Sequence, residues 1–222
     1  MKRGLSRALF FLFAAGSSAC ATDTSGFAVV SNSSSSPIEW HYEYIVDWKA
    51  RFHQEIFNPL THSMRASEGT IYYLRPGKFF WHTVAPSESK LVALQDKFWI
   101  YQPEEKQVFA GTLDFQQPQM KLLLTLLGGG GRLADQFKIE ALPGSRLRKK
   151  LVPKVKIPQL IVAEIEFDRE KQYLKELLLV DSMGQRTTIH FKEVVLNQGL
   201  WEQHQKKPID PFLDRNFNPI LP

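Results

Sequence analysis

The sequence of 222 residues contains a single cysteine, Cys20, and therefore little of the covalent chemistry that thiols provide. One cysteine can form neither a disulfide within the chain nor a paired thiolate site for a metal or for redox exchange. The six histidines are scattered, and no two of them lie four residues apart on a predicted helix, which is the spacing of a helical zinc site. The composition therefore predicts no metal site and no cofactor.

The sequence also lacks the short motifs that mark common catalytic sites. It has no G-x-S-x-G turn and no H-E-x-x-H helix. The four glycines at residues 128–131 are not followed by Lys and Ser or Thr, so they predict a helix end or a hinge rather than a phosphate-binding loop. We predict a protein without catalytic residues. An exported enzyme or a structural β-protein remains an alternative, because catalytic groups can assemble from distant residues.

The chain has no large excess of charge once its N-terminal segment is considered separately. Residues 1–21 have a basic start, an apolar run at residues 8–15 and an A-x-A pattern at residues 19–21, which together indicate a secretory signal peptide. The apolar run is too short to cross a membrane as a helix. Removing residues 1–21 would lower the formal net charge from +5 to +2, which argues against nucleic-acid binding. We therefore predict an exported protein.

Cys20 allows a second interpretation of the same segment. Ser17, Ser18 and Ala19 are small residues before a cysteine, as in a lipobox, although Ser17 stands where a lipobox usually carries an aliphatic residue. If Cys20 were acylated, the protein would be anchored in a membrane. Residues 22–36 are small, polar and rich in serine, which predicts a flexible leader. Residues 37–222 form the single folded domain, with 43% hydrophobic residues in the whole chain to build its core.

Short runs of Ile, Val, Phe, Tyr and Trp dominate residues 69–111. Each run is about as long as one strand, and turn residues separate the runs, which predicts a continuous antiparallel meander. The predicted turns lie at residues 75–77, 85–87, 95–97 and 102–104. Because side chains alternate along a strand, Ile71, Tyr73 and Arg75 should share one face, and Phe79 and Trp81 should share one face of the next strand.

Arg75 is unusual because it stands among aromatic residues. It is either an edge cation whose charged head reaches water or a hydrogen-bond donor at the mouth of a cavity. Alternation alone does not decide between these two roles.

Strand patterns also precede and follow this meander, and two segments are predicted to be helical. Further strands are expected at residues 51–57, 65–75, 160–167, 173–180 and 187–195. Apolar residues at three-to-four spacing predict an amphipathic helix from Ser36 toward Lys49, and residues 118–127 predict a leucine-rich helix. Residues 134–141 fit either a strand or a helix.

A basic run, which extends from Arg146 to Lys156, follows that segment. It is either a solvated loop and strand edge or a patch that meets anionic headgroups or an acidic partner.

Several of these segments resemble the LolA family of outer-membrane lipoprotein carriers. The shared segments are LRPGKFFWH at residues 74–82, PSES at 86–89, WIYQP at 99–103, A-R-F-H-Q at 50–54, and Gly184, Gln185 and Thr187. The resemblance covers roughly residues 37–197. It implies an α+β, mostly β fold: an incomplete, curved antiparallel β-barrel of about ten strands, with a helical lid over a hydrophobic cavity.

The resemblance also implies a function without cofactor or covalent chemistry. Such a protein, a monomer in the periplasm, would take acylated lipoproteins from an inner-membrane lipoprotein-releasing ABC transporter and pass them to a LolB-like outer-membrane acceptor. Two alternatives stay open within the resemblance. The chain could itself be a LolB-like acceptor lipidated at Cys20, or it could carry another lipidic cargo, because residues 214–219 depart from the family's C-terminal pattern.

Individual residues take their expected roles from the same resemblance. Arg75 matches the arginine that holds the lid closed in the empty form of the family. Phe79, Trp81, Leu91 and Trp99 match apolar positions near the cavity, and Trp99 could equally be ordinary core packing.

Overall fold

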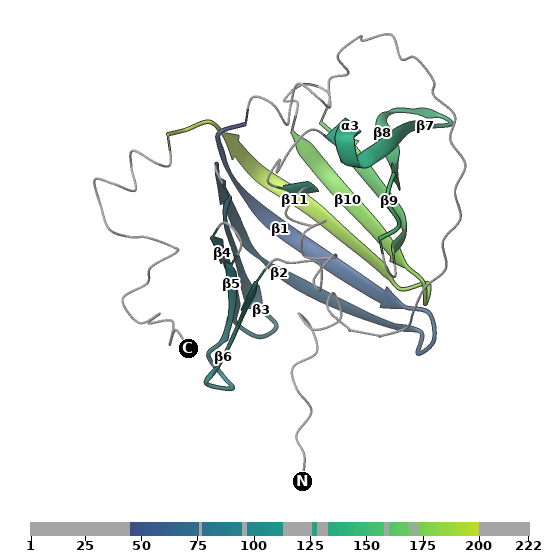
Figure 1. Ribbon diagram of the computed structural model, residues 1–222. Helices are drawn as coiled ribbons and strands as arrows, with labels where there is room; N and C mark the ends of the chain where they lie inside the picture. Colours follow the sequence, from purple (N-terminus) through teal and green to yellow (C-terminus); the bar gives the residue numbers. More distant parts are fainter. Residues whose placement is uncertain are drawn as a thin grey trace.

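The computed structural model describes residues 45–75, 77–94, 97–112, 126–127, 133–157, 160–168, 170 and 173–199, which form one antiparallel sheet and a short helix (Figure 1). The elements are β1 (Asp47–Asn58), β2 (Ser63–Leu74), β3 (Lys78–Ala85), β4 (Ser89–Leu94), β5 (Lys97–Gln102), β6 (Gln107–Thr112), α3 (Leu133–Gln136), β7 (Phe137–Leu142), β8 (Ser145–Pro153), β9 (Leu160–Phe167), β10 (Leu174–Asp181) and β11 (Arg186–Leu196). The signal peptide, the leader, most of the first predicted helix, residues 118–125 of the leucine-rich helix and the C-terminal tail lie outside the described residues.

The eleven strands follow the order β6-β5-β4-β3-β2-β1-β11-β10-β9-β8-β7. The first and last strands of the chain, β1 and β11, therefore pair in the middle of the sheet. The order is open, since it ends on β6 at one edge and on β7 at the other. This confirms the mostly β, incomplete barrel, with eleven strands where about ten were expected. In the part of the chain that the structure describes, no helix is long and apolar enough to cross a membrane.

β1 begins within the segment that was predicted to be helical. Asp47, Trp48 and Lys49 belong to β1, so the prediction of a helix reaching Lys49 is wrong at its C-terminal end. The side chains of Trp48, Ala50, Phe52, Gln54 and Ile56 alternate as buried residues along the strand. A period of two therefore prevails over the three-to-four spacing, because β2 and β11 pair with β1 on both sides and fix it as extended backbone.

The second half of the sheet agrees closely with the sequence patterns. β9 has the predicted bounds, and β10 and β11 differ from the prediction by one residue at each end. The ambiguous segment at residues 134–141 contains both structures, because α3 ends at Gln136 and β7 follows at once. Most of the basic run lies in β8, which is hydrogen-bonded to β7 and β9 and is not an edge strand.

Strong curvature gives the sheet a concave and a convex face (Figure 1). The main hydrophobic cluster joins residues from β1 through β5 and from β7 through β11, which places one continuous core on the concave face. A second, smaller cluster of Phe80, Val92 and Trp99 lies on the convex face of β3, β4 and β5. The concave face is therefore the apolar surface from which a binding site can be built.

Candidate functional site

The concave face of β2, β3, β4 and β5 is made of two cross-strand rows of apolar side chains. One row pairs Ile71 with Trp81, Trp81 with Leu91 and Leu91 with Ile100, and the next row pairs Tyr73, Phe79, Ala93 and Phe98 in the same way. Alternation along each strand sends both rows to the same side. The sequence of this meander therefore determines an extended apolar wall.

Aromatic rings continue this wall onto β1. The rings of Phe52 and Trp81 lie 4.4 Å apart between centroids, and those of Phe79 and Trp81 lie 6.2 Å apart. Gly69 makes the first contact feasible, because a Cβ at this position would lie 1.9 Å from the backbone oxygen of His82 and 2.8 Å from the Phe52 ring. A glycine in the middle of β2 thus lets Phe52 cross the strand and reach Trp81.

Leu126 and Leu127, which are helical, lie buried in the same cluster. The backbone oxygen of Leu127 accepts a buried hydrogen bond of 2.7 Å from Trp48 Nε1. These two residues belong to the leucine-rich helix that the sequence predicts at residues 118–127, and the remainder of that helix lies outside the described residues. The hydrogen bond therefore ties the C-terminal end of this segment to β1.

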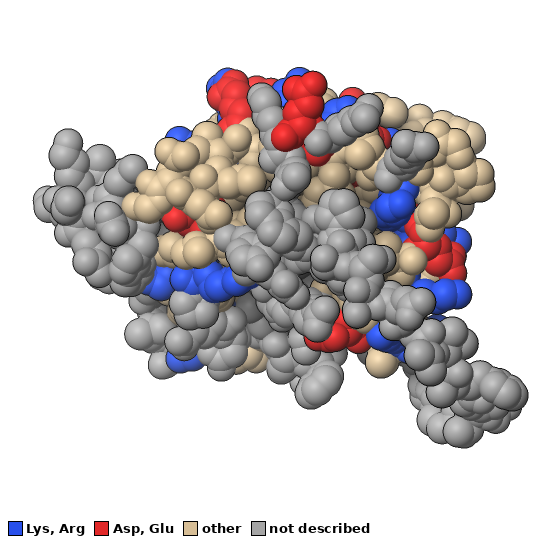
Figure 2. Space-filling view, turned by 90° about the horizontal axis from the view of Figure 1, so that it is seen from above, with Lys and Arg blue, Asp and Glu red and all other residues tan. Residues whose placement is uncertain are grey.

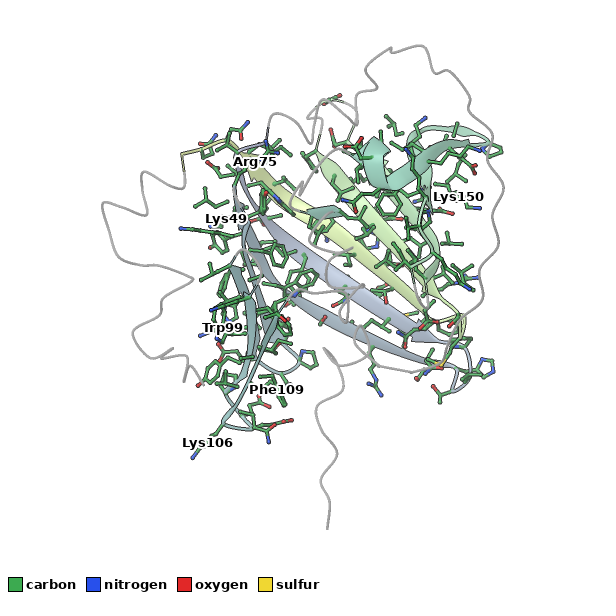
Figure 3. All side chains as sticks on the ribbon, viewed as in Figure 1. Lys49, Arg75, Trp99, Lys106, Phe109 and Lys150 are labelled. Carbon is green, nitrogen blue, oxygen red and sulfur yellow. The ribbon has the colours of Figure 1, made fainter. Side chains whose placement is uncertain are left out.

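Arg75 follows the last residue of β2 and stands at the rim of the concave face (Figure 3). Burial raises the pKa of the neighbouring Tyr73 phenol, while a side-chain hydrogen bond and the positive charge of Arg75 act in the opposite direction. The hydroxyl of Tyr73 is therefore neutral at physiological pH and accepts a hydrogen bond from the guanidinium. This contact connects the rim cation to the row that contains Phe79.

Backbone hydrogen bonds fix the position of this rim. Arg75 N donates to Val46 O (2.8 Å), and Asn197 N donates to Asp47 O (2.8 Å). The Oδ1 atom of Asn197 accepts a hydrogen bond of 2.7 Å from Val46 N, and the Oδ1 atom of Asp47 accepts one of 3.0 Å from Gln198 N. The start of β1, the end of β2 and the end of β11 are thus joined where Arg75 emerges.

Gln54 places a polar group within the concave face. Its side chain is buried, with 2% of its surface exposed. Its Oε1 atom accepts a hydrogen bond of 3.1 Å from Ser67 Oγ, while its Nε2 atom has no hydrogen-bond partner among the residues that the structure describes. A buried amide donor without a partner is costly, and it could bind a carbonyl or ester oxygen of a bound molecule.

The structure brings together three of the four residues that were predicted to line a cavity. Phe79, Trp81 and Leu91 are buried in the concave cluster. Arg75 directly follows β2, whose residues Ile71 and Tyr73 belong to the same cluster. Trp99 is on the other face of the sheet, where it pairs with Val92 and packs with Phe80 (Figure 3). Trp99 therefore does not share a surface with the other three residues.

Sequence reasoning did not assign a binding role to Trp48, Phe52 or Gln54. The sequence signal that could have found them is the alternation along residues 48–56, where buried residues alternate with more exposed ones in the structure. The family resemblance includes Ala50, Phe52 and Gln54 from this segment. The role of Gly69 depends on the register of three strands, and no local pattern reveals it.

The chemistry of this face is burial and hydrogen bonding. Among the described residues, no group of three or more His, Cys, Asp or Glu side chains could hold a metal ion. What the concave wall offers to a ligand is apolar area, an amide donor at Gln54 and a cation at the rim.

Comparison with known proteins relates the chain to one family. The model of the family described as outer membrane lipoprotein carrier protein LolA matches residues 45–204. An outer-membrane lipoprotein carrier protein of Chromohalobacter salexigens is 30% identical over 156 residues, which cover 70% of this chain and 73% of the relative. The proteins of the same name from Pseudomonas aeruginosa strain PAO1 and Azotobacter vinelandii are 30% identical over 166 residues (74% of this chain and 78% of the relative) and 32% identical over 154 residues (68% and 72%).

Two solved structures that match parts of this chain are more distant in sequence. A LolA superfamily protein from Nitrosomonas europaea has a TM-score of 0.43 and 7% identity, over 73% of this chain and 92% of the other. An uncharacterized conserved protein from Thermus thermophilus has a TM-score of 0.45 and 13% identity, over 79% and 92% of the two chains.

Proposed function

This chain belongs to the LolA family of outer membrane lipoprotein carrier proteins, and from this membership we propose that it is a carrier that hides the acyl chains of lipoproteins from water. In this proposal the protein is a periplasmic chaperone that moves lipoproteins between the inner membrane and the outer membrane. No bond is made or broken in such a task. The observation that carries the proposal is the continuous apolar cluster on the concave face of the open sheet.

The proposal extends to parts of the pathway that the family suggests. An inner-membrane ABC transporter would deliver the cargo, and a LolB-like acceptor in the outer membrane would receive it. Residues 1–21 would direct export, residues 22–36 would form a leader, and residues 37–222 would be the carrier domain. The carrier would act as a monomer.

The magnitude of acyl-chain burial explains why a carrier is required. Each buried methylene group contributes ~0.8 kcal/mol, so one chain of ~16 carbons represents roughly 13 kcal/mol. An acylated protein leaves a membrane unaided only very slowly at such a cost. A carrier must offer comparable apolar area and must still release its cargo, which is achieved when part of the binding energy is spent on opening a closed form.

The empty protein needs cover for its apolar face, and two contacts support a closed form. Leu126 and Leu127 lie in the concave cluster, where the Trp48 indole holds the Leu127 carbonyl. Arg75 stands at the rim and contacts Tyr73. We propose that Arg75 stabilises the closed form, that Phe79, Trp81 and Leu91 contact acyl chains in the open form, and that Gln54 binds a polar oxygen of the cargo.

A pair of neighbouring residues in β4 provides a matched test. Leu91 and Val92 are almost equally buried, but Leu91 faces the concave cluster and Val92 faces the convex one. Leu91→Asn and Val92→Asn should lower the free energy of unfolding by similar amounts. Only Leu91→Asn should weaken the binding of a palmitoylated peptide, by about tenfold or more, because it places an amide among the acyl-chain contacts.

Binding is measured by fluorescence of a labelled palmitoylated peptide at temperatures where both variants are folded. Equal weakening in the two variants would contradict binding on the concave face. Lipid analysis of protein purified from cells identifies the natural cargo, and a lipid other than an acylated peptide would indicate a carrier of another lipidic molecule.

Cys20 favours one further candidate function, an outer-membrane acceptor of the same fold. The small residues Ser17, Ser18 and Ala19 before Cys20 are the observation that supports it. Intact mass distinguishes the two functions. A chain that starts at Thr22 supports the periplasmic carrier, whereas an acylated Cys20 found in the membrane fraction supports the acceptor.

A further inference from the structure

Three connections between strands lie at one end of the sheet, opposite to the rim that carries Arg75. β1 and β2 pair from Asp47 with Leu74 to Asn58 with Ser63, so their connection at residues 59–62 is at the far end from Arg75. Phe57 pairs with Arg186, which brings the connection between β10 and β11 to the same end. Leu160 pairs with Asp181, so the connection from β8 into β9 finishes there as well.

This end collects the most exposed large apolar side chains of the described residues. The exposed fractions are 79% for Val155, 75% for Leu60, 62% for Met64, 59% for Ile161 and 54% for Met183. We call these five residues the strand-end patch. All five come from the three connections or from strand residues next to them, so their exposure follows from the topology of the sheet. Apolar groups gathered on an exposed surface commonly mark an interaction site.

Strand register shows that part of the strand-end patch is contiguous. On the convex face, Met64 pairs with Phe57, Phe57 pairs with Arg186, and Arg186 pairs with Val180. The turns that carry Leu60 and Met183 are also adjacent, because a Cβ on Gly184 would lie 3.4 Å from Pro59 Cγ. In Figure 1 these two turns lie side by side at the lower right of the sheet. Leu60, Met64 and Met183 therefore project from one protruding corner.

The charges around the strand-end patch are mostly positive. Residues 59–65, 154–157 and 182–186 contain Arg65, Lys154, Lys156 and Arg186 and no Asp or Glu. Asp181 is the nearest acid in sequence, and its Oδ1 atom accepts hydrogen bonds from the amides of Met183 and Gln185. The face seen from above in Figure 2 differs, since acidic and basic side chains both occur on it.

We propose that the strand-end patch docks on the surface of a bilayer that contains anionic phospholipids. Leu60, Met64 and Met183 would enter the boundary between headgroups and acyl chains, while the cations lie beside the phosphates. The protruding, convex form of the two turns favours a soft, flat lipid surface over a protein partner, which would have to supply a matching concave acidic pocket. This docking goes beyond the proposed carrier function, because it requires no cargo and no residue of the concave face.

Vesicle sedimentation of the cargo-free protein tests the proposal. All variants are made in a starting protein that carries Cys20→Ser, so that acylation does not contribute to binding. The N-terminus of each variant is determined by mass, so that the leader does not contribute to differences between them. The vesicles consist of phosphatidylethanolamine with phosphatidylglycerol, or of phosphatidylcholine alone. The apolar variant is Leu60→Ser with Met64→Ser and Met183→Ser, and the charge variant is Lys154→Gln with Lys156→Gln and Arg186→Gln.

A matched control removes exposed apolar residues from the opposite end of the sheet. It combines Val46→Ser, Leu147→Ser and Val195→Ser, which are also exposed. We expect the starting protein and the control to bind anionic vesicles equally, and each patch variant to bind at least about tenfold more weakly. Binding should also weaken with salt and on phosphatidylcholine, because the phosphates are then screened or the surface is neutral.

Three results would overturn the proposal. The first is failure of the starting protein to bind anionic vesicles, and the second is an equal loss in the control. The third is unchanged vesicle binding by the patch variants together with slower cargo delivery, which would identify the strand-end patch as a surface for a protein. Palmitoylated-peptide binding by the same variants keeps this test separate from the carrier function, since loss of docking should leave cargo affinity unchanged.

Discussion

Single residues at the rim and on the concave wall give this fold its binding character. Arg75 and Gln54 are two polar residues on a surface that is largely apolar, and each is placed by the end or the register of a strand. Within the described part of the chain, the buried Nε2 atom of Gln54 has no hydrogen-bond partner, a situation that is rare in natural folds. Arg75 hydrogen-bonds a buried phenol and occupies the boundary between that interior and water.

Replacement of Arg75 tests the role of this boundary. We expect Arg75→Leu to leave the fold intact and to slow the release of a bound palmitoylated peptide by roughly tenfold, the effect of losing one hydrogen bond to a charged group. The physical reason is that the closed, empty form loses a contact that the open form does not need. Release is measured as the rate of transfer to excess vesicles.

Two variants control this experiment. Arg75→Lys keeps the charge and should release cargo at an intermediate rate. Arg51→Leu removes an exposed cation on the convex face, where it contacts only the exposed Glu193 among the ion pairs of the described residues, and should release cargo normally. Normal release by Arg75→Leu would contradict the proposed role of Arg75 in closure.

At the scale of elements, the strands β8, β9 and β10 are joined by charge on the convex face. Arg148 Nη2 donates to Glu166 Oε2 (2.9 Å) and to Glu176 Oε1 (2.8 Å). Glu166 and Glu176 face each other in register, so their carboxylates would repel without the cation between them. Burial acts to raise the pKa of Glu166, but the hydrogen bonds and charges of Arg148 and Lys175 outweigh it and lower that pKa below its ordinary value.

The pH dependence of this contact gives a second prediction. Because its pKa is lowered on folding, Glu166 contributes stability that is present above the ordinary pKa of a glutamate and is lost as the pH falls through the lowered value. Arg148→Met should therefore lower the free energy of unfolding by about 1–2 kcal/mol at pH 7. The difference from the unchanged protein should shrink once the pH falls below that range. Urea unfolding at a series of pH values measures it.

The control for this prediction is Lys138→Met, which removes a largely exposed cation from β7 that contacts Glu140. Its effect should be within a few tenths of a kcal/mol at every pH, as is usual for an exposed pair. An Arg148→Met penalty that stays constant into the acid range would show that lost packing, and not charge, is responsible.

At the scale of the whole molecule, the curved sheet folds around one core, and strands near both of its edges contribute side chains to that core. The main cluster includes Phe98 from β5 at one side and Phe137 from β7 at the other. The pairing of β1 with β11 joins the two halves through strands that lie more than 100 residues apart in the chain. We infer that neither half has a complete core of its own.

The whole molecule should therefore unfold in one step. Tryptophan fluorescence and far-UV circular dichroism should give the same urea midpoint, because both halves lose their shared core together. Palmitoylated peptide at about 100 times its dissociation constant should stabilise the protein by roughly 2.7 kcal/mol if it binds only the folded state. The unacylated peptide should have no effect. Two separate transitions would show instead that β2–β6 and β7–β10 are independent units.

The sequence by itself determined the elements whose signals are local. Alternation and turn residues defined β3, β9 and β11 to within about a residue. Phe79 and Trp81 of β3 could be placed on one face because side chains alternate along any strand. The residue types and spacings in the segments at residues 74–82, 86–89 and 99–103 together indicate the family. Local chemistry decides such features, so they can be predicted without knowledge of the fold.

Only the tertiary structure decided the features that depend on distant partners. Residues 47–49 became strand because β2 and β11 pair with them, which overrode their helical spacing. Trp99 was separated from Trp81 by the register of β4 with β5, and the strand-end patch arose because the topology brings three connections to one end. Each outcome depends on which strands lie side by side, and pairing between residues far apart in the chain leaves no periodic signal in the sequence.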